Sequence, residues 1–229
     1  MSFTAVAERF VSANYPRATI AVLAGSTARG ERTASSDIDL LLIGDDLFGD
    51  DRIGEAATYS FEGEVFEVFA YTPQGFDEWA TRDMERHRPV IVEMLVRGIP
   101  VRRDHGLDAM RTFWADRLAE GPNLSDAESR LRRYIITDLL DDLRDIADGL
   151  EKQVVAGLLF ERTAELMLLT AGRWIGTGKW LPRRLREWDA TRAGALAAAL
   201  TSGDHAAFAD QVQAELDRAG GRVQAGFRR

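Results

Sequence analysis

The sequence predicts a mixed α/β (α+β) core in its first half and an all-α helical bundle in its second half. Short apolar runs of strand type, such as residues 19–24 and 38–43, alternate with helical patterns in the first half. In the second half the apolar residues recur at helical spacing, without a strand pattern. A turn-forming stretch, Glu120-Gly121-Pro122-Asn123, separates the two patterns. We therefore expect two domains, residues 1–120 and residues 121–229.

The bulk composition is that of a globular protein and excludes several classes. Of the 229 residues, 45% are hydrophobic and 29% charged, and the absence of cysteine excludes disulfides and thiolate metal sites. The N-terminus lacks the apolar core of a signal peptide, and no apolar run is long enough to span a membrane. We expect a cytoplasmic protein without a membrane partner. The formal net charge of −8 disfavours a broad nucleic-acid-binding surface and is compatible with a small or cationic acceptor.

In the first half, helical spacing of apolar residues predicts an opening helix over residues 2–13. The strand at 19–24 then leads through a Gly-Ser turn and a short helix into the strand at 38–43. Two further strands are predicted at residues 57–61 and 64–71, joined by a tight turn at Glu62-Gly63. We expect Glu62 and Glu64 beside that turn to be solvated.

Proline and glycine mark the elements that complete this half. Thr72 followed by Pro73 predicts the start of a helix that continues to about residue 86. A second helix is expected after Pro89 and is ended by Gly98, and residues 99–102 form a short strand at the sheet edge, where a proline is tolerated. His87 lies in the charged stretch between the two helices, and we expect it on the surface.

The second half begins with a capping box, Ser125-Asp126-Ala127-Glu128, which predicts a long helix to about residue 148. We expect Gly149 to interrupt this helix and a second one to run over residues 151–170. Two more helices are predicted at residues 183–199 and 204–218, and the tail from residue 220 onward is expected to be loose.

A cluster of residues suited to nucleotide chemistry lies between the first two strands. Gly25 lets the backbone approach a ligand closely, and Ser26 stands at a helix start, where free N–H groups and the helix dipole favour a phosphate. Asp37 and Asp39, two apart at the second strand, should point to the same face. Their hard carboxylate oxygens suit Mg²⁺ that carries substrate phosphates.

The order of these residues closely resembles the signature of the polymerase-β-type nucleotidyltransferase superfamily: Gly-Ser, a ten-residue spacer (27–36), then Asp-x-Asp. The layout is similar to aminoglycoside- and lincosamide-type nucleotidyltransferases, which carry a C-terminal helical domain. The resemblance implies ATP as the nucleotide and two Mg²⁺ ions held by Asp37, Asp39 and a third acidic residue on a later strand. Glu67 fits that place, because an unpaired charge among the apolar neighbours of its strand would be costly without a partner or metal. The alternative for Glu67 is an exposed strand residue.

Further candidate residues contact the phosphates or the acceptor in this interpretation. Arg29 could face the phosphates or pair with Glu31 or Asp37. Lys179 could reach a triphosphate, as basic residues do in relatives, or be a surface lysine; its glycine-rich surroundings lack the spacing of a P-loop. Four aspartates form one face of the helix after Ser125, and by the resemblance a carboxylate of this domain acts as general base, with Asp138 and Asp142 as candidates. The four are Asp138, Asp141, Asp142 and Asp145.

We therefore expect a Mg²⁺-dependent nucleotidyltransferase that moves a nucleoside monophosphate, AMP from ATP in the first instance, to a hydroxyl of a small-molecule acceptor. One such acceptor is an aminoglycoside-like antibiotic. Its modification would give the protein a role in antibiotic resistance. The active site is expected between the two domains, the helical one facing the acceptor. Two alternatives stay open: a protein-modifying minimal nucleotidyltransferase of the antitoxin type, which the helical domain disfavours, and an inactive nucleotide-binding module, which the three carboxylates disfavour. The motif leaves the acceptor and the oligomeric state open.

Overall fold

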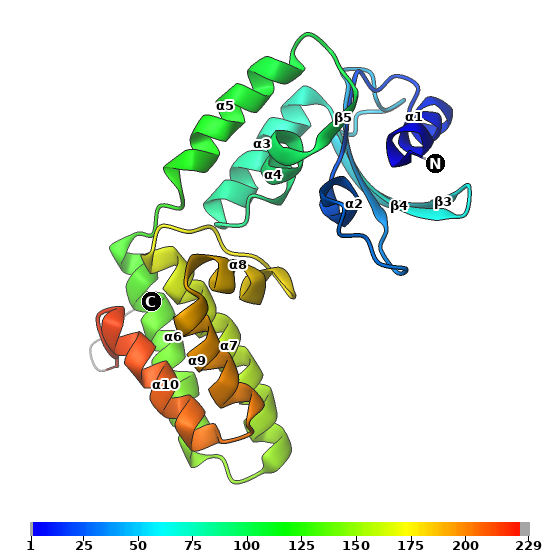
Figure 1. Cartoon of the computed structure of the whole chain (residues 1–229). Coiled ribbons are helices and arrows are strands. Elements are labelled where there is room, and N and C mark those ends of the chain that lie inside the picture. Colours follow the sequence, from blue (N-terminus) through cyan, green and yellow to red (C-terminus); the bar gives the residue numbers. More distant parts are fainter. Residues whose placement is uncertain (1, 225–229) are drawn as a thin grey trace. The chain divides into compact units, whose positions relative to one another are not determined.

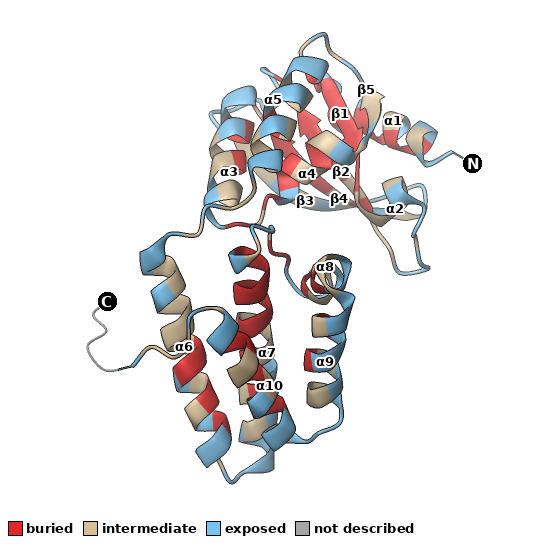
Figure 2. Ribbon diagram, turned by 60° about the vertical axis from the view of Figure 1, so that its left-hand side comes forward, coloured by how far each residue is buried: buried red, intermediate tan, exposed pale blue. Residues whose placement is uncertain are grey.

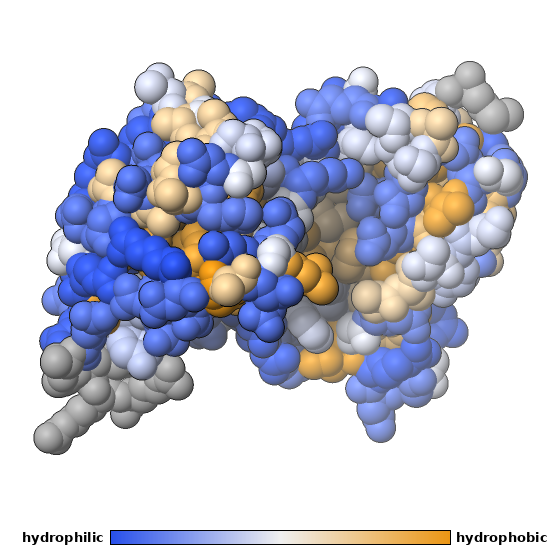
Figure 3. Space-filling model, turned by 90° about the horizontal axis from the view of Figure 1, so that it is seen from below, coloured by the Kyte–Doolittle hydropathy of each residue, from blue (hydrophilic) through white to orange (hydrophobic). Residues whose placement is uncertain are grey.

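The computed structural model describes residues 2–224, and the chain divides into two compact units, Met1–Glu120 and Gly121–Arg229. Figure 1 traces the order of the helices and strands in both units. Within the described residues, no helix combines the length and the apolarity that a membrane crossing requires. Figure 3 shows that the surface visible in that view is largely hydrophilic, with hydrophobic side chains in small patches.

The first unit contains all the strands of the described chain. Its elements are α1 (Phe3–Asn14), β1 (Ile20–Leu23), α2 (Gly25–Arg29), β2 (Ile38–Ile43), β3 (Gly54–Phe61), β4 (Glu64–Tyr71), α3 (Pro73–Glu85), α4 (Val90–Arg97), β5 (Ile99–Arg102) and α5 (Leu107–Glu120).

The five strands form one mixed sheet in the order β3-β4-β2-β1-β5. The central pair β2 and β4 is parallel, and the other neighbours are antiparallel. One face packs on α1, with Phe10 stacked on Phe66 at 4.3 Å between ring centroids, and the other face is covered by α3, α4 and α5. Figure 2 shows the buried strands between these two helical layers. The predicted mixed α/β core is therefore confirmed.

The hairpin turn and the helix cap in this unit follow from local sequence. Glu62 and Gly63 both have positive φ, 51° and 82°, as expected for the two central residues of a tight hairpin turn whose twist matches the strands. The Thr72 side chain accepts a hydrogen bond from the N–H of Gly75 at 3.1 Å and so caps α3. Glu62 is exposed, as expected, and pairs with Arg9, whereas Glu64 is only partly exposed and pairs with Arg32.

Two features of this unit differ from expectation. The prediction that His87 lies on the surface is wrong: the side chain is only 5% exposed. The reason is the backbone after α3, where His87 has φ 61° and its N–H bonds to the carbonyl of Met84, so that the chain turns the ring inward. Helix α5 was not predicted, because it buries only Leu107 and Trp114 and therefore shows little helical periodicity.

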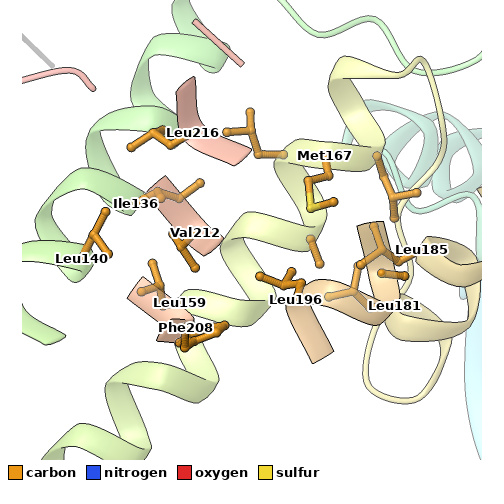
Figure 4. Packing of buried hydrophobic residues seen from close by; sticks show 14 of the residues in the cluster. Ile136, Leu140, Leu159, Met167, Leu181, Leu185, Leu196, Phe208, Val212 and Leu216 are labelled. Carbon is orange, nitrogen blue, oxygen red and sulfur yellow. The ribbon is translucent and has the colours of Figure 1, made fainter. Parts of the chain in front are cut away.

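The second unit is all helical in its described part, which confirms the predicted bundle. Its helices are α6 (Asp126–Asp145), α7 (Gly149–Thr170), α8 (Trp180–Trp188), α9 (Ala190–Thr201) and α10 (His205–Arg218). Figure 4 shows the core, to which buried side chains of all five helices contribute. Nine residues of α7 are buried, more than in any other helix of the unit, and α7 is therefore the central helix of the bundle.

The helix boundaries in this unit depend on aspartate caps that sequence periodicity did not reveal. The Asp148 side chain accepts from the N–H groups of Leu150 and Glu151, so α7 begins at Gly149, and the interruption lies just before that glycine. Asp189 caps α9 in the same way, with φ −149°, and divides the expected single helix 183–199 into α8 and α9.

The prediction of a loose tail is wrong for residues 220–224; residues 225–229 lie outside the described part of the chain. The Arg133 guanidinium donates to the carbonyls of Gly220 and Gly221, and the N–H of Val223 donates to Thr137 Oγ1 at 3.2 Å. These bonds come from α6, so the end of the described chain is fastened along that helix. The cause is a set of long-range contacts to which local sequence gives no clue.

Candidate active site

Three carboxylates meet at one end of the sheet, those of Asp37, Asp39 and Glu67. One oxygen from each lies within 4.8 Å of the others. Asp39 is in β2 and Glu67 in β4, where they are direct partners in the parallel register, and Asp37 immediately precedes β2. All three point to the sheet face that α3 and α4 cover further along the same strands. The structure thus brings together the three acidic residues that the sequence singled out.

The negative charges of the three carboxylates repel one another. Burial, together with the negative charges of Asp37 and Glu67, raises the pKa of Asp39 to about 6, while the nearby Arg29 partly opposes this rise. Burial and the charge of Asp37 also raise the pKa of Glu67. Three half-buried carboxylate oxygens at this separation match the ligands that a hard divalent cation prefers. A bound cation would neutralise the repulsion, so this triad could hold a metal ion.

Gly25 lies directly against the triad. Its φ is +63°, and a Cβ added to it would lie 1.6 Å from Asp39 Oδ2, inside the volume of the carboxylate. The N–H of Ala24 bonds to the carbonyl of Asp39 at 2.8 Å, which fixes the turn to β2. Only glycine fits here, both for its conformation and for its size. The Gly-Ser turn of the motif and the acidic residues therefore form one site.

Ser26 follows in α2, a helix of five residues. The first N–H groups of a helix have no partner within it and can donate to an anion. Thr27, which the sequence did not single out, donates from Oγ1 to the carbonyl of Asp37 at 3.2 Å. It lies inside the spacer of the motif, and only the folded arrangement shows that it contacts Asp37.

The other candidate residues are placed as follows. Arg29 is exposed and pairs with Glu31 at 3.0 Å, one of the options that the sequence left open. Lys179 is exposed just before α8, and Asp138 and Asp142 are exposed on α6; all three belong to the helical unit. The neighbouring Asp141 differs, because it accepts hydrogen bonds from Arg222 and Gln224 of the fastened tail.

Comparisons with known proteins agree with this geometry. Residues 6–93, which span the Gly-Ser turn and all three carboxylates, match the family model described as a nucleotidyltransferase domain. The fold is similar to the crystal structure of a nucleotidyltransferase-like protein from Exiguobacterium sibiricum 255-15, with a TM-score of 0.51 and 13% identity over 93% of this chain and 74% of that one. No curated protein matches the sequence. Residues 6–93 are therefore a nucleotidyltransferase domain of the polymerase-β-type superfamily, and the chain is a nucleotidyltransferase enzyme.

Proposed function

We propose that the protein transfers a nucleoside monophosphate, AMP from ATP, to a hydroxyl of a small-molecule acceptor, with an aminoglycoside-like compound as the first candidate. The observation that carries this proposal is the convergence of Asp37, Asp39 and Glu67 beside the Gly25–Ser26 turn. A carboxylate triad suited to a metal ion, packed against the Gly-Ser turn at the start of α2, fits the needs of nucleotidyl transfer.

Asp37, Asp39 and Glu67 would hold two Mg²⁺ ions, for which their oxygen donors are suited. When bound, these ions stabilise the negative charge that develops on the transferred and leaving phosphates. Ser26 and the first N–H groups of α2 hold the terminal phosphates, and Arg29 adds positive charge nearby. Glu67 lies in β4, which borders β2 on the side opposite to β1 and the Gly25 turn. We assign Glu67 to the acceptor side of the site.

In the reaction, the acceptor hydroxyl oxygen forms a bond to the α-phosphorus, and the bond from that phosphorus to the oxygen bridging to the β-phosphate breaks. Pyrophosphate leaves, and the hydroxyl proton passes to a base. Asp138 and Asp142 are the candidates for this base in the helical unit, because their carboxylates are exposed and Asp141 between them is occupied by Arg222. Lys179 of the same unit is assigned to the triphosphate. Single substitutions Asp138→Asn, Asp142→Asn and Lys179→Met test these three roles.

The acidic balance supports a cationic acceptor. The net charge is −8, and three carboxylates form the site itself. A polyamine sugar with free hydroxyls would be attracted by this charge and would offer the nucleophile. The helical unit, residues 121–229, is assigned to acceptor recognition.

The test is ATP-dependent pyrophosphate release in the presence of Mg²⁺, screened over aminoglycosides, lincosamides and candidate protein acceptors. Mass spectrometry of the acceptor identifies the group transferred, and parallel reactions with GTP, CTP and UTP establish the nucleotide. The double variant Asp37→Asn, Asp39→Asn should abolish transfer while circular dichroism shows an intact fold.

The matched control is Asp45→Asn with Asp46→Asn, two exposed aspartates in the loop after the same strand. This control should keep wild-type activity. Transfer that survives in the Asp37/Asp39 double variant would refute the proposed site. Nucleotide binding without release of pyrophosphate for any acceptor would point to an inactive binding module, and labelling of a protein would point to the antitoxin type.

A further inference from the structure

Asp37 differs from the other two carboxylates in how the fold holds it. The parallel ladder between β2 and β4 begins at Ile38, which pairs with Phe66, and Asp39 and Glu67 are the next partners. Ladder hydrogen bonds therefore fix Asp39 and Glu67 relative to each other. Asp37 precedes the ladder and belongs to the segment between α2 and β2, so its position depends on what holds that segment.

Within the segment, hydrogen bonds are mostly local. The N–H of Ser36 bonds to the carbonyl of Thr33 at 3.1 Å, and the N–H of Thr33 bonds to Ser36 Oγ at 2.9 Å, which forms a small turn just before Asp37. Thr27 fastens the carbonyl of Asp37 to α2. These bonds shape the segment and tie it to α2, but they do not connect it to the strand that carries Glu67.

Arg32 makes that connection. It is in the middle of the segment, and its side chain is 20% exposed, whereas Glu31, Thr33, Ala34 and Ser35 around it are exposed to solvent. Its Nη2 forms a salt bridge with Glu64, the first residue of β4 and three residues before Glu67. Its guanidinium carbon lies 4.6 Å from the centre of the Phe3 ring in α1. One side chain thus links the segment before Asp37 to the start of the strand that holds Glu67.

The way in which Arg32 is held favours arginine over lysine at this position. The planar guanidinium can pair at its edge with Glu64 and stack by its face on Phe3 at the same time, which a lysine ammonium cannot do. This geometry restrains the segment in two directions.

We propose that Arg32, through Glu64 and Phe3, is a positioning residue that holds Asp37 at the distance from Glu67 needed to share a metal ion. The inference rests on the proposed function, because it assumes that the triad binds metal. It assigns no contact between Arg32 and the nucleotide or the acceptor. Loss of Arg32 should therefore weaken metal binding and leave the affinity for the nucleotide nearly unchanged.

The test measures Mn²⁺ binding to the full-length protein by electron paramagnetic resonance of the free ion, without nucleotide or turnover. Outer partners that orient metal ligands typically change metal affinity by about 10–100-fold when removed, and we expect Arg32→Gln to weaken Mn²⁺ binding roughly tenfold. Glu64→Gln should act in the same direction. The charge swap Arg32→Glu with Glu64→Arg should regain part of the loss, and Arg32→Lys should fall between Arg32→Gln and wild type.

The matched control is Arg9→Gln. Arg9 of α1 pairs with Glu62 in the turn of the β3–β4 hairpin, and its other hydrogen bond is to the carbonyl of Ala5 in its own helix. Its loss should leave Mn²⁺ binding unchanged. In steady-state kinetics, Arg32→Gln should raise the metal concentration for half-maximal activity and lower kcat, with little change in the KM for the nucleotide. Circular dichroism checks that each variant folds. If Arg32→Gln does not fold, Arg32→Lys and Glu64→Gln take its place in the binding measurement.

The outcomes separate the two ideas. Wild-type protein that binds Mn²⁺, together with an Arg32→Gln variant that binds it equally well, would overturn the positioning role and leave the proposed metal site standing. Equal losses in Arg32→Gln and Arg9→Gln would also overturn it, because any broken ion pair on the hairpin would then suffice. Wild-type protein that binds no Mn²⁺ would overturn both the metal site and this inference.

Discussion

Replacing Asp39 by asparagine should stabilise the metal-free protein, although it removes a central residue of the site. The pKa of Asp39 is raised from its usual 3.8 to about 6, foremost by burial and then by the charges of Asp37 and Glu67. A raised pKa means that the fold disfavours the ionised carboxylate. The stability of the fold is therefore greatest below the pKa of the unfolded chain and falls as the pH rises toward 6, with the full penalty present above that.

The size of the penalty follows from the same values. A difference of about two pKa units corresponds to about 3 kcal/mol, and the partial exposure of the side chain reduces this to about 1–2 kcal/mol. At pH 8 in EDTA, Asp39→Asn should raise the free energy of unfolding by that amount. The midpoint of thermal unfolding should rise by roughly 2–8 °C, because about 1 kcal/mol shifts the midpoint by about 2–4 °C in a chain of this size.

The assay is differential scanning calorimetry of the full-length chain at pH 8 and at pH 4, with EDTA and then with Mg²⁺. The gain from Asp39→Asn should shrink to a small fraction at pH 4, where the carboxyl of the folded wild type is protonated as well. Added Mg²⁺ should stabilise the wild type more than the variant, because ligand binding to the folded state adds to stability. Asp45→Asn, at an exposed aspartate beyond the other end of β2, is the control. A lower midpoint for Asp39→Asn in EDTA at pH 8, or an equal gain at pH 4, would refute the reasoning.

Three further predictions concern contacts that the structure makes specific. Gly25→Ala should abolish transfer and lower the free energy of unfolding by about 1–3 kcal/mol, measured by urea unfolding. The reason is that the new Cβ would overlap the Asp39 carboxylate and take a strained φ. Full activity would contradict the close packing of Gly25 against Asp39. Asp189→Ala should lower the free energy of unfolding by about 1 kcal/mol, seen as a lower urea midpoint, because α9 loses its cap. Asp189→Asn should keep most of the wild-type stability. An equal loss of stability in both variants would count against the capping role. Thr137→Val should speed tryptic cleavage at Arg222, because the bond that holds Val223 is lost; cleavage at the wild-type rate would argue against the fastened tail.

Much of the fold was predictable because its signals are local. The turn at Glu62-Gly63 and the cap at Thr72 each depend on residues a few positions apart, and the structure places them as the sequence indicated. Helix α5 and the inward turn of His87 were not predictable in this way. The first buries too few residues to produce a clear period, and the second depends on a single left-handed backbone position. The break at Asp189 shows that a cap within an otherwise helical pattern is easily overlooked.

The sequence by itself determined the chemistry of the site, because a Gly-Ser turn and an Asp-x-Asp pair at fixed spacing specify backbone shape and ligand type without reference to the rest of the chain. Only the tertiary structure decided that Glu67 completes the triad, since its place beside Asp39 follows from the parallel pairing of β2 with β4. It also decided that Arg32 reaches Glu64, and that residues 220–224 are hydrogen-bonded to α6. Such contacts join residues far apart in the chain, and they form only when packing of the whole unit has overcome the entropy of bringing them together.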